Sequence, residues 1–332
     1  MHTLTTADGY DVVLDRLQSQ DPNQPAGKVV FLNHGYVSSS NDWTLRGPNY
    51  GLAYALVKAG YDPWMLNNRG NGISPIEGYA GDFWDFSLDD IGINDTKVAV
   101  DYILDQTGAP DMTFIGHSQG ATTYFMFCLE YPEYEDIFDK YIGMALCSAK
   151  NTHRIFINSE NSLIQANKFN FDFGKAMYDI VHAYCNTVGI TLCRYAYIVG
   201  FGYSPNEINN AILRQILQHF PYDASAKNFY QIASWIGRDD IHKYDYGINN
   251  MKVYGTSTPP IYNLNKLTKT PKYFFYGGQD TLIIPKAVEF ALKYKIENLV
   301  KAYRINTYAH NDFIFGVSVS NINNEILKIL AS

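Results

Sequence analysis

The stretch Met112-Thr113-Phe114-Ile115-Gly116-His117-Ser118-Gln119-Gly120 decides the fold of this chain of 332 residues. An apolar run precedes Gly116, and the segment 121–131 behind Gly120 has the composition of a helix. A serine held on a sharp turn between a strand and a helix needs small residues two positions to either side, because side chains there would collide with the neighbouring backbone. Gly116 and Gly120 meet this need, so the stretch predicts a strand, a tight turn that presents Ser118, and a helix.

Outward from this turn, short apolar runs alternate with segments of helical periodicity. The expected strands are 29–32, 64–66, 112–115, 272–276 and 302–305, and the expected helices are 50–59, 87–106 and 285–296. Such alternation predicts the α/β class, with a mostly parallel central sheet flanked by helices. Ser87 and Asp90 form a capping box at the start of the longest helix, and Gly108 with Pro110 ends it.

The block 149–254 interrupts this alternation. It is rich in aromatic and amide side chains and has helical segments with little strand character; one helix is expected to open at Ser204-Pro205-Asn206-Glu207 and to run through Leu217. We therefore expect a core formed by residues 1–148 and 255–332, with an inserted helical cap formed by 149–254. A second helical domain that packs elsewhere is the alternative.

The composition excludes several classes of protein. Hydrophobic residues make up 46% of the chain and charged residues 18%, which is enough apolar material for a large core. A formal charge of −7 argues against nucleic acid as a partner. No stretch reaches the ~18 apolar residues of a transmembrane segment. No Cys/His cluster has zinc spacing, so neither a metal nor another cofactor is expected.

Asp280 and His310 are the candidates to activate Ser118. A serine hydroxyl becomes a nucleophile when a base takes its proton, and the base needs an acid to orient it. With a turn of this kind the partners follow in the order serine, acid, histidine. Asp280 follows a late strand, and His310, the only histidine after it, follows the next strand. Asp312 is a rival acid, but its place beside His310 favours a local capping role.

Acyl transfer also needs hydrogen-bond donors for the oxyanion that develops on the substrate. The N–H of Gln119, directly after Ser118, is the first candidate. The loop Asn33-His34-Gly35-Tyr36 follows the strand 29–32, so the N–H of Tyr36 is the second, with Gly35 allowing a close approach of the backbone. His34 is expected to pack beneath this loop.

The four cysteines bear on the redox compartment. Cys128 and Cys147 sit inside apolar segments, which predicts buried thiols. Cys185 and Cys193 lie in an aromatic region that contains glycine, and their spacing allows either a disulfide across a short loop or two free thiols. Residues 1–9 show no basic segment followed by an apolar stretch, so no signal peptide is expected in this chain.

Seven strings along the chain are distinctive: Asp8-Gly9-Tyr10, Asn33-His34-Gly35, Asn67-Asn68-Arg69-Gly70-Asn71, Phe83-Trp84-Asp85-Phe86-Ser87, Gly116 to Gly120, Gly277-Gly278-Gln279-Asp280 and His310-Asn311-Asp312-Phe313. Together they resemble the acid lipase family of α/β-hydrolases, the group of gastric and lysosomal acid lipases. The resemblance implies a catalytic triad of Ser118, Asp280 and His310 and oxyanion donors on Tyr36 and Gln119. It also implies a disulfide between Cys185 and Cys193.

The activity that this resemblance implies is hydrolysis of neutral lipids, such as triacylglycerols and cholesteryl esters, through an acyl-enzyme on Ser118. The expected partner is an acyl-lipid substrate at a lipid–water interface, in a secreted or lysosome-like compartment; no protein partner is indicated. Aromatic side chains of the cap are expected to line an acyl pocket: Phe169, Phe171, Phe173, Tyr195, Tyr197, Phe201, Tyr203 and Trp235. A soluble short-chain carboxylesterase and a catalytically idle hydrolase-fold assembly subunit are the alternatives.

Overall fold

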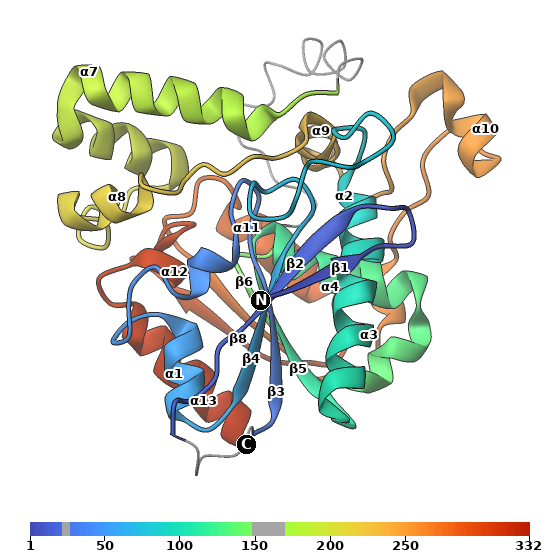
Figure 1. Cartoon of the computed structure of the whole chain (residues 1–332), viewed down its shortest axis with the longest axis horizontal. Coiled ribbons are helices and arrows are strands. Elements are labelled where there is room, and N and C mark those ends of the chain that lie inside the picture. The colour runs from blue at the N-terminus through green and yellow to red at the C-terminus, as the bar shows by residue number, and fades with distance from the viewer. Residues whose placement is uncertain (22–26, 148–169) are drawn as a thin grey trace.

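The computed structural model describes residues 1–21, 27–147 and 170–332, which form an eight-stranded sheet with helices on both faces (Figure 1). The strands are β1 His2–Thr5, β2 Asp11–Arg16, β3 Val29–Asn33, β4 Asp62–Asn67, β5 Met112–His117, β6 Phe138–Met144, β7 Lys272–Gly277 and β8 Leu299–Ile305. Their order across the sheet is β1-β2-β4-β3-β5-β6-β7-β8. Strand β2 is antiparallel to β1 and β4, and the other neighbours are parallel, which confirms the α/β prediction.

The helices of the sheet core are α1 Leu52–Lys58, α2 Leu88–Asp90, α3 Thr96–Thr107, α4 Gln119–Glu130, α11 Pro285–Tyr294, α12 Asp312–Phe315 and α13 Val319–Ala331. The segment between β6 and β7 is called the insertion below. Its described part holds the helices α7 Phe173–Phe201, α8 Asn210–Ile216, α9 Ala226–Ser234 and α10 Asn250–Tyr254. Short 3-10 turns are η1 Ser40–Trp43, η3 Pro132–Ile137, η4 Gly247–Asn249 and η5 Leu264–Lys266, and Ile91–Asp95 is a π-helical turn, η2.

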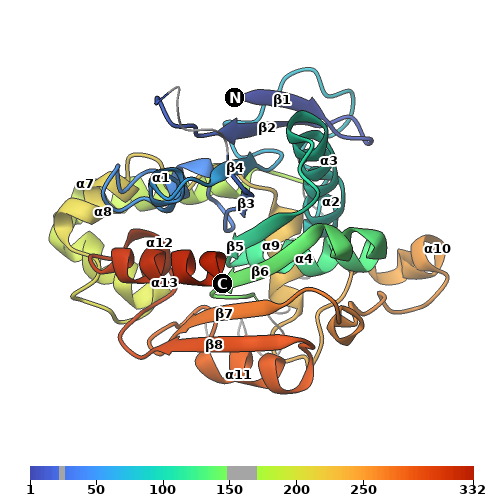
Figure 2. The ribbon, with the colours of Figure 1, turned by 90° about the horizontal axis from the view of Figure 1, so that it is seen from below.

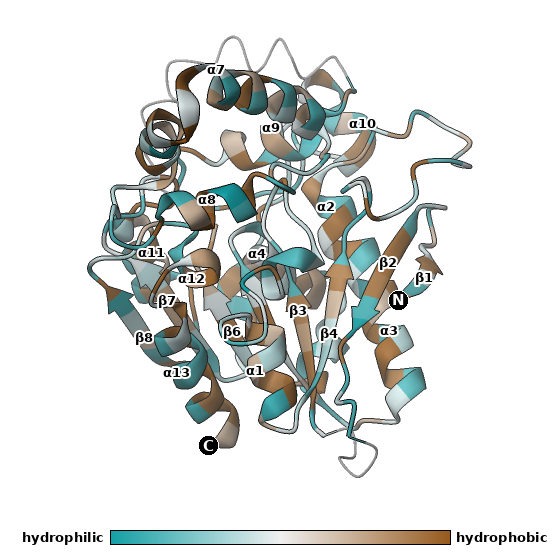
Figure 3. Ribbon diagram, turned by 60° about the vertical axis from the view of Figure 1, so that its left-hand side comes forward, coloured by the Kyte–Doolittle hydropathy of each residue, from teal (hydrophilic) through white to brown (hydrophobic). Residues whose placement is uncertain are grey.

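Alternate side chains of the sheet supply two hydrophobic layers. Phe31, Phe114 of β5 and Phe274 of β7 pack with side chains of α3 and α4, whereas Leu32 and Phe275 pack with those of α1 and α13. This two-residue period is that of a strand buried on both faces. Figure 2 shows α1 and α13 on one side of the sheet and α3 and α4 on the other. In Figure 3, β3 is hydrophobic along its length, whereas α7 carries both hydrophobic and hydrophilic bands.

The sequence pattern predicts β3, β4, β5, β7 and β8 but misses β1, β2 and β6. Strands β1 and β2 form a hairpin at the edge of the sheet, where half-exposed positions accept polar residues and weaken the apolar signal. Strand β6 begins with Phe138-Asp139-Lys140, and the charged side chains of Asp139 and Lys140 interrupt its apolar run.

The helix expected over 87–106 has the predicted ends and an unexpected interior. The capping box of Ser87 and Asp90 is present, and Gly108 ends α3 in the left-handed conformation with φ 60°. Between α2 and α3, however, the chain forms the π turn Ile91–Asp95. The carboxylate of Asp95, at its end, accepts both the backbone N–H of Arg69 at 2.9 Å and the Nε–H of Arg69 at 2.7 Å.

Arg69 joins two of the distinctive strings. Its guanidinium is fully buried, donates to Asp8 at 2.6 and 3.0 Å, and lies 4.1 Å from the centre of the Tyr10 ring. Burial acts to lower the pKa of Arg69, but the charges of Asp95 and Asp8 outweigh burial and raise it. The buried ion pair with Asp95 holds Arg69 in the core, and the part-buried pair with Asp8 joins the turn between β1 and β2 to it.

The insertion packs on the loops that leave the sheet. The N–H of His310 donates to the carbonyl of Phe201 at 3.1 Å, and Gly202 forms an antiparallel bridge with Asp280. Figure 1 shows α7, α8, α9 and α10 at one end of the core. The predicted first residue of the cap, Ala149, lies outside the described residues.

The start expected for the helix at Ser204 is wrong. Residues 204–207 form a turn, with the N–H of Glu207 on the carbonyl of Ser204 at 3.0 Å, and α8 begins only at Asn210. The side chain of Asn209 accepts the N–H groups of the first turn, Ala211 at 3.0 Å and Ile212 at 2.9 Å. Asn209 is therefore the N-cap of α8.

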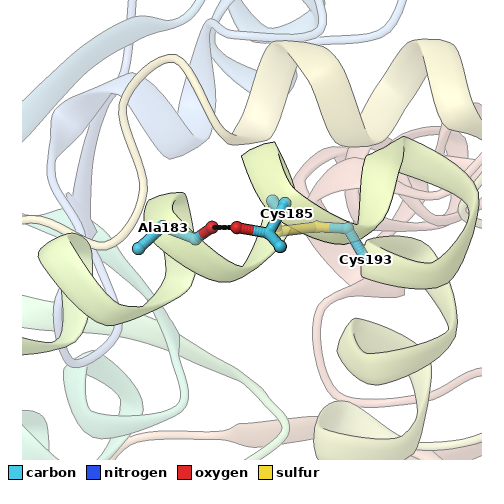
Figure 4. Close-up of a disulfide and its surroundings, with 4 residues drawn as sticks. Ala183, Cys185 and Cys193 are labelled. Atoms are coloured by element: carbon cyan, nitrogen blue, oxygen red, sulfur yellow. Dashed lines mark hydrogen bonds between the residues drawn. A yellow bond between two sulfur atoms is a disulfide. The ribbon is translucent and has the colours of Figure 1, made fainter.

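Helix α7 consists of two helical halves that meet at Gly189. This residue has φ 76° and ψ 160°, a conformation accessible in practice only to glycine. Cys185 and Cys193 stand on either side of it and form a disulfide, with their Cα atoms 4.9 Å apart (Figure 4). The bond joins the two halves across the kink. Cys128 and Cys147 are free and buried, as expected.

Candidate active site

Ser118 occupies a strained turn between β5 and α4. Its backbone has φ 54° and ψ −119°, which is unfavourable for a residue with a Cβ, and its N–H donates to the carbonyl of Met144 at 2.8 Å. A Cβ on Gly116 would lie 2.4 Å from the carbonyl oxygen of Gly120, and one on Gly120 would lie 2.2 Å from that of Asn33. Both glycines are therefore required for this turn to form.

Ser118, His310 and Asp280 lie in one hydrogen-bonded line. Nε2 of His310 is 2.9 Å from Oγ of Ser118, and its Nδ1 is 2.9 Å from Oδ2 of Asp280. The other oxygen of Asp280 accepts the backbone N–H groups of Leu282 at 2.9 Å and Ile283 at 2.8 Å. The side chains of His310 and Asp280 are only 5% and 1% exposed. The carboxylate is therefore fixed on both oxygens and orients the imidazole toward the serine.

Asp312 has a different environment from Asp280. Its carboxylate accepts the N–H of Ala309 at 2.6 Å and supports the loop that carries His310. Burial is the main influence on Asp312 and raises the pKa of its carboxyl to about 7. Asp280 therefore contacts the His310 ring, whereas Asp312 holds the loop that carries it.

The loop after β3 lies directly against Ser118. A Cβ on Gly35 would be 3.4 Å from that of Ser118, and Val37 has a φ of 51°, a rare conformation for a β-branched residue. His34 lies beneath this loop: its Nδ1 donates to the carbonyl of Gly35 at 2.8 Å, and its Nε2 accepts the backbone N–H of Asn68 at 3.3 Å. Burial lowers the pKa of His34 to about 4, so the ring is neutral and supports the loop.

Two further contacts connect this loop and α4 to the insertion. The hydroxyl of Tyr36 donates to the carbonyl of Ser225 at 3.0 Å, and the side-chain oxygen of Gln119 accepts from Asn228 at 2.9 Å. The backbone N–H of Gln119 is in the first turn of α4, where amides have no partner within the helix. Tyr36 and Gln119 are thus held beside Ser118 by residues of the insertion.

An apolar cavity of about 110 Å³ opens onto Ser118 and His310. Its other lining residues are Tyr36, Cys147, Phe229, Ile232, Ala233, Trp235, Ile236, Leu282 and Ile283. Of the aromatic residues expected to line an acyl pocket, Trp235 does so. Tyr195 and Tyr203 are exposed instead, and Phe169 lies outside the described residues.

Helix α9 and the turn after it form one wall of this cavity, and Trp235 is the only residue of that wall that the sequence predicted. Phe229, Ile232, Ala233 and Ile236 follow the spacing i, i+3, i+4 and i+7 of one helix face. That apolar periodicity could have identified the wall. The roles of Asn68 and Asn228 have no comparable signal, because each depends on a partner far away in the sequence.

Within residues 1–21, 27–147 and 170–332, no group of three or more His, Cys, Asp or Glu side chains is arranged to hold a metal ion. Over the same residues, no helix has the length and hydropathy required to cross a membrane.

The sheet order and the serine-bearing turn are those of the α/β-hydrolase fold. Residues 28–317 match the family model described as alpha/beta hydrolase fold, and residues 1–47 match the one described as a partial alpha/beta-hydrolase lipase region. Among solved structures, an esterase from Exiguobacterium antarcticum superposes with a TM-score of 0.63 at 15% identity and covers 99% of both chains. At that identity the likeness shows the fold.

Curated relatives give the family. Lipase 3 of Drosophila melanogaster is 30% identical over all of this chain and 89% of its own length. Gastric triacylglycerol lipase of Homo sapiens is 28% identical over 99% of this chain and 87% of its own length. The chain therefore belongs to the acid lipase family of α/β-hydrolases, and it is a carboxylic ester hydrolase.

Proposed function

We propose that Ser118, His310 and Asp280 are the catalytic triad and that the substrates are acyl esters of neutral lipids, such as triacylglycerols or cholesteryl esters. The observation that carries this proposal is the position of His310, which lies within 2.9 Å of both Ser118 Oγ and Asp280 Oδ2 beside an apolar cavity. A base so placed can take the serine proton as the hydroxyl attacks.

The reaction proceeds in two balanced steps. In the first, Ser118 Oγ attacks the ester carbonyl, His310 Nε2 takes the hydroxyl proton and returns it to the leaving alcohol, and an acyl-enzyme remains. In the second, His310 takes a proton from water, which attacks the acyl group; the proton returns to Ser118 as the carboxylic acid leaves. The backbone N–H groups of Tyr36 and Gln119 stabilise the oxyanion in both steps.

Two observations support an acyl lipid as the substrate. The cavity beside Ser118 is lined mainly by aliphatic and aromatic side chains, which suit an acyl chain. Curated relatives over nearly the whole chain are named triacylglycerol lipases. An oxidising, secreted or lysosome-like compartment is part of this proposal and agrees with the disulfide between Cys185 and Cys193.

The size of the cavity favours a second candidate, a carboxylesterase for short acyl chains. An engineered cavity of roughly 150 Å³ in another protein holds a benzene molecule. The 110 Å³ beside Ser118 therefore matches an acyl chain of a few carbons.

The acyl-length dependence of kcat/KM separates the two candidates. We expect kcat/KM for p-nitrophenyl esters to rise from butyrate to octanoate, with up to ~0.8 kcal/mol contributed by each methylene group buried. Ile232→Trp, which fills the cavity, should move the preference toward butyrate, while Ile180→Trp on the exposed face of α7 should leave it unchanged. A profile that falls beyond butyrate would favour the short-chain esterase. No hydrolysis of any of these esters would favour the third alternative, a catalytically idle assembly subunit.

A further inference from the structure

His310 is held through its main chain as well as through its ring. Its N–H donates to the carbonyl of Phe201 at 3.1 Å, and its own carbonyl oxygen is 2.9 Å from Nε2 of His117. Because a carbonyl oxygen only accepts, Nε2 of His117 carries the proton of this bond. The main chain of His310 is therefore clamped between the end of α7 and the residue that precedes Ser118.

His117 makes this bond as a neutral ring with one donor. The residue is 3% exposed, and burial first, then the neighbouring His310, lowers the pKa of His117 to about 3. Its Nδ1 is buried and has no hydrogen-bond partner within the described residues. Position 117 therefore contributes one hydrogen-bond donor, located where Nε2 of the ring lies.

The ring of His117 also adjoins the other parts of the site. Its centre is 5.1 Å from the centre of the His310 ring, and a Cβ on Gly35 would lie 3.2 Å from its Nδ1. The cavity beside Ser118, as described, is not lined by His117. The residue thus touches the loops that carry the proposed base and the proposed oxyanion donors without facing the space for substrate.

We propose that His117 is a positioning residue for hydrolysis: the bond from its Nε2 to the carbonyl of His310 sets the approach of the His310 ring to Ser118 Oγ. This inference rests on the proposed function. Since His117 stands outside the cavity, its loss should lower kcat and leave KM nearly unchanged. A purely structural residue would instead change the amount of folded enzyme.

Three substitutions test the role of this donor. His117→Gln keeps an amide nitrogen near the position of Nε2, His117→Asn can reach only the position of Nδ1, and His117→Leu has no donor. Active sites are counted by the burst of p-nitrophenol released by a p-nitrophenyl phosphonate, and kcat and KM are then measured with p-nitrophenyl butyrate. We expect His117→Asn and His117→Leu to lower kcat about tenfold with KM within twofold, and His117→Gln to keep more than half of kcat.

Two outcomes would overturn the proposal. One is an unchanged kcat in His117→Asn and His117→Leu; the other is an equal loss in all three variants, which would mean that the ring rather than its N–H matters. If His117→Leu does not fold, the pair of Gln and Asn variants decides between these outcomes. Ser118→Ala, measured alongside, tests the proposed function separately, because retained activity in that variant would refute the triad whatever the effect at His117.

Discussion

The sheet core and the helical insertion differ in how deeply they bury their side chains. In the core, the guanidinium of Arg69 is fully buried and paired, and the strands β3 to β7 bury their large side chains. In the insertion, α7 exposes large apolar side chains; Ile180 is 70% exposed and Val199 is 66% exposed. The core therefore holds the residues of the site in a fixed geometry, whereas the insertion leaves several of its apolar side chains exposed.

The largest expected effect is the loss of activity caused by a substitution in the core. Asp280→Asn should lower kcat by about 10⁴-fold, because the imidazole loses the partner that fixes its tautomer. Asp312→Asn, the matched change two residues from His310, should lower kcat far less, since Asp312 holds the loop through the N–H of Ala309. Both variants should fold, as measured by circular dichroism. Reversed effects would show that the acid has been assigned to the wrong aspartate.

A second test concerns stability in the core. Arg69→Met leaves Asp95 buried without its cation, so the free energy of unfolding should fall by about 3–5 kcal/mol. Lys97→Met is the control: it removes a partly exposed pair with Asp101 and should cost at most about 1 kcal/mol. Urea denaturation measures both. Equal losses in the two variants would contradict the view that the core depends on buried charge pairs.

Loss of the disulfide should destabilise the insertion and leave the core unchanged. Replacing Cys185 and Cys193 by serine removes a short closed loop worth about 2 kcal/mol. We expect faster amide hydrogen exchange in α7 and unchanged exchange in β5. Thr187→Ala is the control, since it removes only a bond to the carbonyl of Ala183 within the same half of α7. Faster exchange in β5 as well would mean that the core and the insertion unfold together.

A further prediction concerns the pH dependence of the free energy of unfolding. Burial, opposed by bonds from Ser38 and Gly35, raises the pKa of Asp42 from 3.8 to about 7. Between about pH 4 and 7 the folded state keeps a proton that the unfolded state has lost, so this group makes the free energy of unfolding fall as pH rises through that range.

Asp42→Asn should remove this contribution to the change of the free energy of unfolding with pH. Asp105→Asn, at the exposed end of α3, should leave that change as it is. His34 titrates with the opposite sign: its pKa is lowered from 6.5 to about 4, so its contribution is lost as pH falls through that range. The test is therefore the difference between variants from urea titrations at pH 4.5 and 7.5. Identical slopes in Asp42→Asn and the wild type would show that Asp42 is ionised throughout.

The parts of the molecule that the sequence predicts are those set by local rules. The turn at Ser118 follows from the steric needs of Gly116 and Gly120, and strands buried on both faces, such as β3, read as apolar runs. The parts it misses depend on distant partners. The π turn ends at Asp95, which pairs with Arg69, and His117 has a role only because the carbonyl of His310 folds against it.

Covalent labelling shows directly whether Ser118 is the nucleophile. The wild-type enzyme is treated with a fluorophosphonate, and the modified peptide is identified by mass spectrometry; the same treatment is applied to Ser118→Ala and Asp280→Asn. We expect one adduct, on Ser118, that is absent in Ser118→Ala and forms far more slowly in Asp280→Asn. An adduct on another residue, or ester hydrolysis that persists in Ser118→Ala, would show that Ser118 is not the nucleophile.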